Sequence, residues 1–167
     1  MMIGPLQKGG LEMGTGKSGR YLNTNGSKRT VSDFALVHSN EGKYTKPQRG
    51  QHIRLVSGGH GQTNIDQLKK YGIPYNIVKT YPNGVRVGNI PTHKSKTKRT
   101  GIGQAWFPKT WTPRDIKHAG EHVASLKHNR NIKDGNTIYG MWKGVRVGVK
   151  RTNGRIATVF PDSHQPY

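Results

Sequence analysis

Histidine is the residue type in this sequence that is best suited to chemistry. The chain has eight histidines and no cysteine, and its eight carboxylates show no pair with the local spacing of an acid/base couple or a metal site. An imidazole has a pKa of about 6.5, so at neutral pH one histidine can accept a proton while another donates one. Cleavage of an RNA backbone needs a base for the 2′-hydroxyl, an acid for the departing 5′ oxygen and a cation beside the phosphorane.

Three of the eight histidines remain as candidates once their surroundings in the sequence are considered. The others lie on the polar side of a predicted helix, in polar stretches near the C-terminus, or in the N-terminal segment: His118, His122, His128, His164 and His38. The three candidates are His52, His60 and His93. The sequence does not say which histidine would be the acid and which the base.

The charge of the chain indicates a polyanionic partner. Lys and Arg number 28 against 8 acidic residues, which gives a formal charge of +20 over 167 residues. Nucleic acid is the first candidate partner, because the basic residues alternate with Gly, Thr and Asn and do not line one face of an amphipathic helix. We find no membrane-spanning segment and no secretion-signal pattern in the sequence, so we expect another protein to carry the chain if it is exported.

The elements that must position these histidines begin near residue 49. Residues 1–48 are rich in Gly, Ser, Asn and Lys and are predicted to be a basic linker or weakly ordered arm, and residues 49–167 to be the folded domain. Turn signals such as Asn153-Gly154 and the Thr112-Pro113 helix start divide the domain. The predicted elements are a helix over 64–71, strands over 75–79 and 85–90, a basic loop over 92–99, a strand over 103–107, a helix from Thr112, and strands over 137–142, 145–150 and 155–160.

The order of several short motifs resembles the EndoU nuclease family. His52-Ile53, the Gly58–Gly61 segment with His60 inside it, the Trp106-Phe107-Pro108 segment and the C-terminal Ala157–Pro161 segment follow one another as in that family. The resemblance implies an α+β fold in which two small antiparallel β-sheets form a groove with helices packed outside.

The resemblance also implies roles for individual residues. It assigns catalysis to His52 and His60, with His93 as the alternate, and to Lys98 and Thr158. It assigns substrate binding to Phe160, and the charge of the basic loop adds Lys94, Lys96 and Arg99 as residues expected to hold the phosphates. Phe160 stands where the family often has Tyr, so its ring can still stack but its hydroxyl is missing. No metal and no cofactor is expected.

The implied function is that of a metal-independent endoribonuclease toxin. Such modules cut RNA to a 2′,3′-cyclic phosphate, commonly in transfer RNA, and an immunity protein, expected here to be acidic, neutralises them. The resemblance further implies contact-dependent growth inhibition, with export as part of a larger effector and action in the cytoplasm of the target cell. Two alternatives stay open: a non-catalytic basic RNA-binding module, and a colicin-like or barnase-like nuclease on a different sheet.

Overall fold

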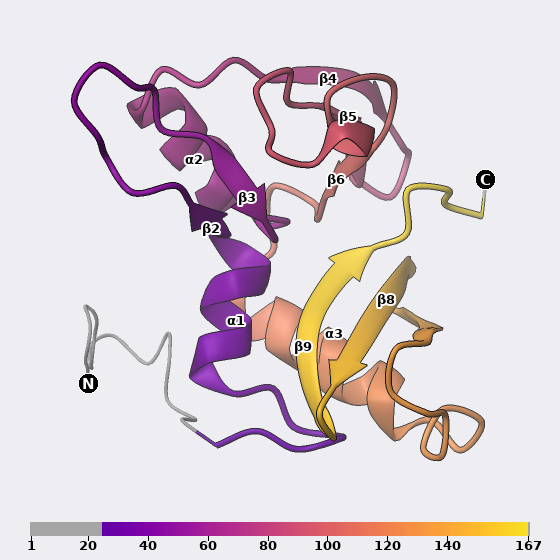
Figure 1. The fold of residues 1–167 in the computed structure, drawn as a ribbon. Coiled ribbons are helices and arrows are strands. Elements are labelled where there is room, and N and C mark those ends of the chain that lie inside the picture. The colour runs from indigo at the N-terminus through magenta and orange to yellow at the C-terminus, as the bar shows by residue number, and fades with distance from the viewer. Residues whose placement is uncertain (1–24, 167) are drawn as a thin grey trace.

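The computed structural model describes residues 25–166, which form three helices, one 3₁₀ turn and three antiparallel sheets (Figure 1). The predicted α+β class is confirmed, and the described part of the chain holds three small sheets where two were predicted. None of its helices is long and apolar enough to cross a membrane. In chain order, the elements are α1 (Asp33–Asn40), β2 (Lys43–Tyr44), β3 (Leu55–Ser57), α2 (Gln62–Lys70), β4 (Asn76–Thr80), β5 (Arg86–Asn89), η1 (Lys96–Lys98), β6 (Gln104–Trp106), α3 (Pro113–Ser125), β7 (Thr137–Trp142), β8 (Val145–Thr152) and β9 (Arg155–Pro161).

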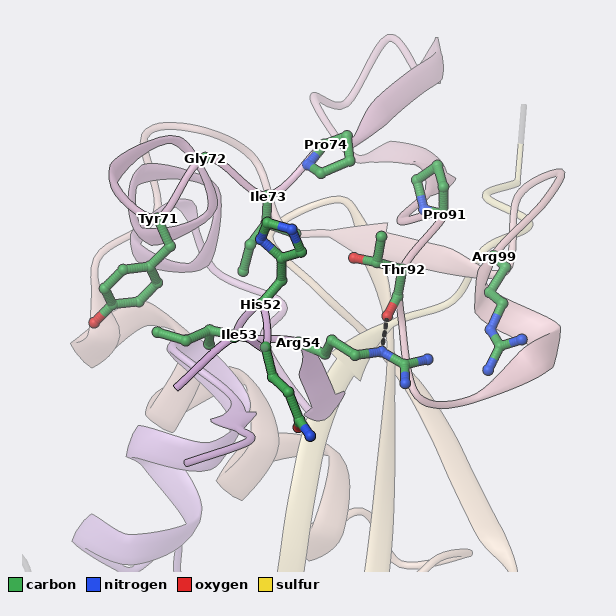
Figure 2. Close-up of a pocket in the computed structure, with 12 residues that line it drawn as sticks. His52, Ile53, Arg54, Tyr71, Gly72, Ile73, Pro74, Pro91, Thr92 and Arg99 are labelled. Carbon is green, nitrogen blue, oxygen red and sulfur yellow. Dashed lines mark hydrogen bonds between the residues drawn. The ribbon is translucent and has the colours of Figure 1, made fainter. Parts of the chain in front are cut away.

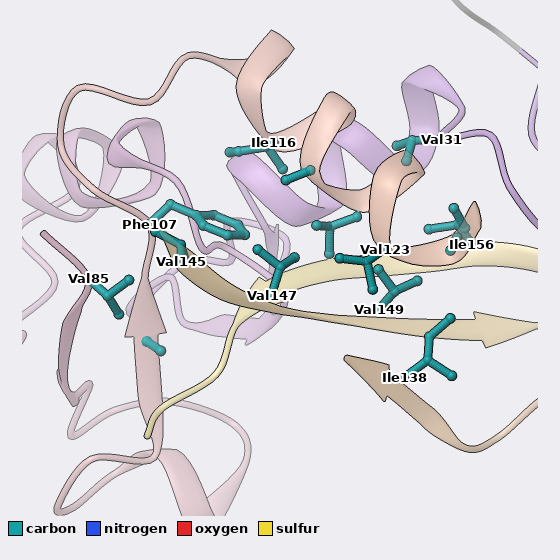
Figure 3. Packing of buried hydrophobic residues seen from close by; sticks show 14 of the residues in the cluster. Val31, Val85, Phe107, Ile116, Val123, Ile138, Val145, Val147, Val149 and Ile156 are labelled. Carbon is teal, nitrogen blue, oxygen red and sulfur yellow. The ribbon is translucent and has the colours of Figure 1, made fainter. Parts of the chain in front are cut away.

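Helix α3 packs on the C-terminal sheet, in which β8 lies between β7 and β9. Thr112 caps the helix through a capping box with Asp115, and Pro113 occupies its first turn, as the sequence predicted. Figure 3 shows side chains of α3 directed at Val147 and Val149 of β8. A Cβ on Gly120 would lie 2.5 Å from Val159, so the missing side chain allows α3 to approach β9 closely.

A second, smaller core holds the other half of the fold together. It consists of buried residues from β3, α2, β6 and the loops between them: Leu55, Ile65, Leu68, Ile73, Ile90 and Trp106. The indole of Trp106 donates a hydrogen bond of 3.0 Å to the Asn64 side chain of α2, which satisfies both buried polar groups. This core fixes α2 and β3 against the β4–β5–β6 sheet.

Part of the predicted arm is folded. Val31, Ala35 and Leu36 are buried in the main core, and α1 lies beside β9 (Figure 1). The sequence pattern missed this helix because α1 is only eight residues long, and its apolar Phe34 is exposed while polar residues lie on its buried side. Residues 1–24 of the predicted arm lie outside the described residues.

The hydroxyl of Ser39 joins α1 to β9. It donates a hydrogen bond of 2.7 Å to the Ala35 carbonyl and accepts one of 2.9 Å from the Val159 amide, and all three groups are buried. Without this oxygen, the Val159 amide would be buried and unpaired, which costs more free energy than the loss of an exposed hydrogen bond.

We expect Ser39→Ala to lower the free energy of unfolding by about 1–3 kcal/mol, because it leaves the buried Val159 amide without an acceptor. Urea unfolding measures the change. The matched control is Ser125→Ala at the end of α3, where the serine side chain makes no hydrogen bond within residues 25–166. Equal stability of the two variants would contradict this role of Ser39.

Candidate active site

His60 is held by backbone groups on three sides. Its amide donates to the Ser39 carbonyl of α1 at 2.6 Å, and its carbonyl accepts from the Phe107 amide at 2.7 Å. Its ring Nδ1 lies 2.8 Å from the Ala105 carbonyl oxygen of β6. The position and the ring orientation of His60 are therefore set by α1 and β6 together.

The hydrogen bond to Ala105 fixes the tautomer of the ring. Because a carbonyl can only accept, Nδ1 must carry the proton, and in the neutral ring Nε2 then holds the lone pair. His60 is 6% exposed, and burial, with a contribution from the Lys98 charge, lowers its pKa to about 3. At neutral pH, Nε2 of His60 is therefore available as a proton acceptor.

Lys98 and Gln104 form a polar bridge to the segment that carries His60. The Lys98 Nζ lies 3.3 Å from both the Gly103 carbonyl and the Gln104 Oε1. Gln104 is fully buried, and its Nε2 donates to the Gly59 carbonyl at 2.8 Å. Burial lowers the pKa of Lys98, and the charge of Lys98 acts on both His60 and His93. The sequence patterns did not single out Gln104.

His38 is a further histidine of this site that the sequence patterns placed in the arm. It lies in the last turn of α1, is partly buried, and its charge acts on His60. A Cβ on Gly58 would lie 3.0 Å from the His38 Nε2, and Gly58 has a φ of +69°, so glycine is needed here for both space and conformation. Burial and the nearby Lys43 lower the pKa of His38.

His93 is fully buried, and its charge acts on His60 as that of His38 does. Its Nδ1 accepts a hydrogen bond of 2.8 Å from the Ser95 amide, so its proton is on Nε2, which has no hydrogen-bond partner within residues 25–166. Burial first, and then Lys98 and other neighbouring cations, lower its pKa to about 4. This geometry suits a residue that shapes the loop, because the lone pair of Nδ1 is already occupied by the Ser95 amide of the same loop.

The structure does not bring His52 into this group. The residue precedes β3, its side chain is exposed, and it lines a separate pocket beside the end of α2 (Figure 2). His52 is not among the charged groups that shift the pKa of His60. His52 and His60 flank β3, so they lie at opposite ends of a strand although they are close in sequence.

Thr158 and Phe160 lie two residues apart on β9 and therefore on one face of the strand. The ring of Phe160 is 5.9 Å from that of His60 and 6.4 Å from that of Tyr139. A Cβ on Gly148 of the neighbouring strand would lie 2.5 Å from the Phe160 ring, so this glycine makes room for the aromatic side chain.

The basic loop carries the other predicted binding residues. Lys94 and Lys96 are exposed, whereas Arg99 is partly buried and donates to the carbonyls of His93 and Lys94 at 2.7 and 3.3 Å. The charge of Lys98 thus acts on His60, whereas the side chain of the next residue, Arg99, binds carbonyl groups of the basic loop itself.

We refer to His38, His60 and Lys98, together with Phe160 near the His60 ring and Thr158 on the same face of β9 as Phe160, as the His60 cluster. It combines two imidazoles and an ammonium group near an aromatic ring, which is a set that can bind a phosphodiester and move protons around it. Within residues 25–166, no group of three or more His, Asp or Glu side chains could hold a metal ion.

The buried histidines make the stability of the fold depend on pH. In the unfolded chain their pKa is about 6.5, but in the folded chain His60 stays neutral down to about pH 3 and His93 down to about pH 4. As the pH falls below 6.5, the unfolded state binds protons that the folded state does not, so the free energy of unfolding falls. We expect a loss of up to about 1.4 kcal/mol per pH unit for each of these histidines.

Urea unfolding between pH 7 and pH 5 measures this slope. In His60→Gln the slope should be smaller by one histidine's share, whereas it should be unchanged in His122→Gln, which alters an exposed histidine of α3. An identical slope in the wild-type chain and in His60→Gln would contradict a neutral, buried His60.

The sequence matches one protein-family model over most of its length. A family model described as bacterial EndoU nuclease matches residues 34–163, which include α1 and all residues of the His60 cluster. No curated protein and no solved structure shows a significant match to the chain. Because the family model covers most of the sequence, the chain belongs to the bacterial EndoU nuclease family.

Proposed function

We propose that the chain is a metal-independent endoribonuclease in which His60 is the general base, His38 the general acid and Lys98 the cation that stabilises the transition state. The observation that carries the proposal is the fixed ring of His60, whose Nδ1 bond to Ala105 leaves Nε2 as a lone-pair acceptor next to Lys98. The family supports nuclease chemistry, and the pair of imidazoles supports RNA, because the 2′-hydroxyl supplies the nucleophile.

In the proposed reaction, Nε2 of His60 takes the proton of the 2′-hydroxyl and the 2′ oxygen attacks phosphorus. The bond from phosphorus to the 5′ oxygen breaks as His38 donates a proton to that oxygen. Lys98 offsets the negative charge of the phosphorane. The products are a 2′,3′-cyclic phosphate and a 5′-hydroxyl, and the proton balance is restored when His38 regains a proton and His60 loses one.

The low pKa of His60 is compatible with this role once substrate is bound. A phosphodiester brings a negative charge beside His60, His38 and Lys98, and a negative charge raises the pKa of all three groups. His60 thus becomes a stronger base and His38 a better-populated acid in the complex than in the free protein.

Thr158 and Phe160 would seat the nucleotide. The Phe160 ring offers a stacking surface 5.9 Å from the His60 ring. Phe160 has no hydroxyl with which to select one base, so we expect base preference to be weaker than in relatives with Tyr at this position.

We further propose a toxin role, with transfer RNA as the substrate. The charge of +20 supports steering toward RNA and favours an acidic immunity protein as the inhibitor. In this proposal the chain is the nuclease module of a larger exported effector, active in contact-dependent growth inhibition, and it acts in the cytoplasm of the target cell.

We expect His60→Gln to lower kcat/KM for RNA by at least about 100-fold, because it removes the general base. The assay incubates the chain with total bacterial RNA in EDTA and tests the 3′ ends of the fragments for cyclic phosphate. His122→Gln on the exposed side of α3 is the matched control and should cleave as well as the wild-type chain. Cleavage that survives in His60→Gln would overturn the mechanism, and intact RNA with salt-sensitive binding would indicate a non-catalytic binder.

The choice between His38 and His52 as the second histidine has its own test. We expect His38→Gln to lower kcat by about 100-fold or more, and His52→Gln to leave kcat within a few-fold, because of these two histidines His38, and not His52, is among the charges that act on His60. Single-turnover cleavage measures the chemical step directly. A large loss of kcat in His52→Gln alone would show that His52, and not His38, takes part in the reaction.

A further inference from the structure

A pocket of about 690 Å³ borders the basic loop, and none of the residues that line it belongs to the His60 cluster (Figure 2). Its walls come from the segment before β3, the end of α2 and the basic loop. The volume falls within the range of about 300–1,000 Å³ that is typical of small-molecule sites. The pocket is lined by residues 50–54, residues 71–74, Pro91, Thr92 and Arg99.

Two guanidinium groups define one side of the pocket. Arg54 donates through Nε to the Thr92 carbonyl at 2.7 Å and more weakly to the His93 carbonyl, and Arg99 donates to His93 at 2.7 Å. Both side chains are thus held in place, but the Nη1 group of each has no hydrogen-bond partner within residues 25–166. No carboxylate is among the described lining residues, so the pocket attracts anions.

The rest of the pocket suits a flat, partly apolar group. Figure 2 shows Tyr71 at the end of the pocket away from Arg99, with His52 and Ile73 between them. Ile73 is buried, whereas Tyr71 is 44% exposed and His52 is exposed. Planar rings beside guanidinium groups are the combination with which proteins bind the bases and phosphates of single-stranded nucleic acids.

The basic loop connects this pocket to the His60 cluster. Lys98 reaches the cluster and the next residue, Arg99, lines the pocket. The carbonyl of His93 accepts hydrogen bonds from both arginines, and the Lys94 amide donates to the Leu55 carbonyl at 2.9 Å, which fixes the loop to β3. A strand whose scissile phosphate lies at Lys98 could therefore continue over the loop into the pocket.

We infer that the pocket binds one nucleotide of the substrate strand outside the scissile linkage, with its phosphate at Arg54 and Arg99 and its base against Tyr71 and His52. The inference rests on the proposed ribonuclease function and extends it to a second subsite. It predicts that affinity depends on the length of the RNA, because a dinucleotide fills the His60 cluster but does not reach the pocket.

The test measures binding with a probe that cannot be cleaved. A 2′-O-methyl RNA decamer and the corresponding dinucleotide lack the nucleophilic hydroxyl, and fluorescence anisotropy gives Kd for each at one salt concentration. The pocket variants are His52→Glu and the isosteric Gln51→Glu, whose exposed side chains make no hydrogen bonds within residues 25–166. The charge-matched control is His122→Glu on α3. Thermal unfolding confirms that the variants are folded.

We expect His52→Glu to weaken decamer binding by about tenfold and Gln51→Glu by a smaller factor, because each adds a negative charge to the lining of the pocket, which repels the phosphate of the bound nucleotide. Dinucleotide binding should change by less than about twofold in both variants, and His122→Glu should leave decamer binding within about twofold. Equal decamer affinity in the wild-type chain and both pocket variants would overturn the inference. So would an equal loss for decamer and dinucleotide, since that would indicate a general charge effect.

This readout is independent of catalysis. If unmodified RNA is not cleaved but the decamer binds through the pocket, the nuclease mechanism fails and the pocket stands as a nucleotide site. If RNA is cleaved through His60 and the pocket variants bind the decamer normally, the pocket inference fails alone.

Discussion

The hydrogen bonds between the end of α1 and the Gly58–Gly61 segment are the interaction on which the candidate active site depends. Three consecutive amides, of Gly59, His60 and Gly61, donate to three consecutive carbonyls at the end of the helix. These carbonyls have no partner inside the helix, so the segment satisfies groups that would otherwise need water. The same contacts bring His38 and His60 together and leave no freedom in the backbone that carries the imidazole. The hydroxyl of Ser39 adds β9, and with it Phe160, to this junction.

Burial makes His60 a weaker base, and a bound substrate would reverse part of this effect. Burial and the Lys98 charge lower the pKa of His60 to about 3, which keeps the lone pair of Nε2 free but makes it a weak proton acceptor. A phosphodiester neutralises part of the Lys98 charge and adds its own field, so it strengthens the base only where the substrate is bound. In the proposed mechanism, Lys98 would therefore act twice: it depresses the basicity of the empty site, and it would stabilise the phosphorane in the occupied one. Gln104 binds Lys98 on one side and the Gly59 carbonyl, next to His60, on the other. It therefore holds Lys98 and the His60 segment at a fixed separation, on which the effect of the Lys98 charge depends.

Local signals in the sequence predicted most of the fold. The Thr112-Pro113 helix start and the Asn153-Gly154 turn are confirmed, because capping and turn chemistry act between residues that are neighbours in the chain. The predictions that depend on distant contacts were less complete. His38 lies on α1, whose burial against β9 no local pattern shows, and Gln104 is polar yet fully buried because its partners come from Gly59 and Lys98. His52 and His60 were paired because their motifs resemble those of the family, but β3 lies between them in the fold, and His52 lines a separate pocket.

Two of the arginines that contribute to the charge of +20 are held in fixed orientations, so they can do more than attract a polyanion from a distance. Charge alone would bind any polyanion, and its effect would fade as salt rises. Arg54 and Arg99 are different, because each uses part of its hydrogen-bonding capacity on carbonyls of the basic loop. These bonds orient the guanidinium groups before any ligand arrives, so less side-chain entropy is lost when a phosphate binds. The same bonds hold the loop from which Lys98 reaches His60. In the proposed function, binding and catalysis share one scaffold, and a substrate strand held both at Lys98 and in the pocket would be positioned more precisely than one attracted by net charge.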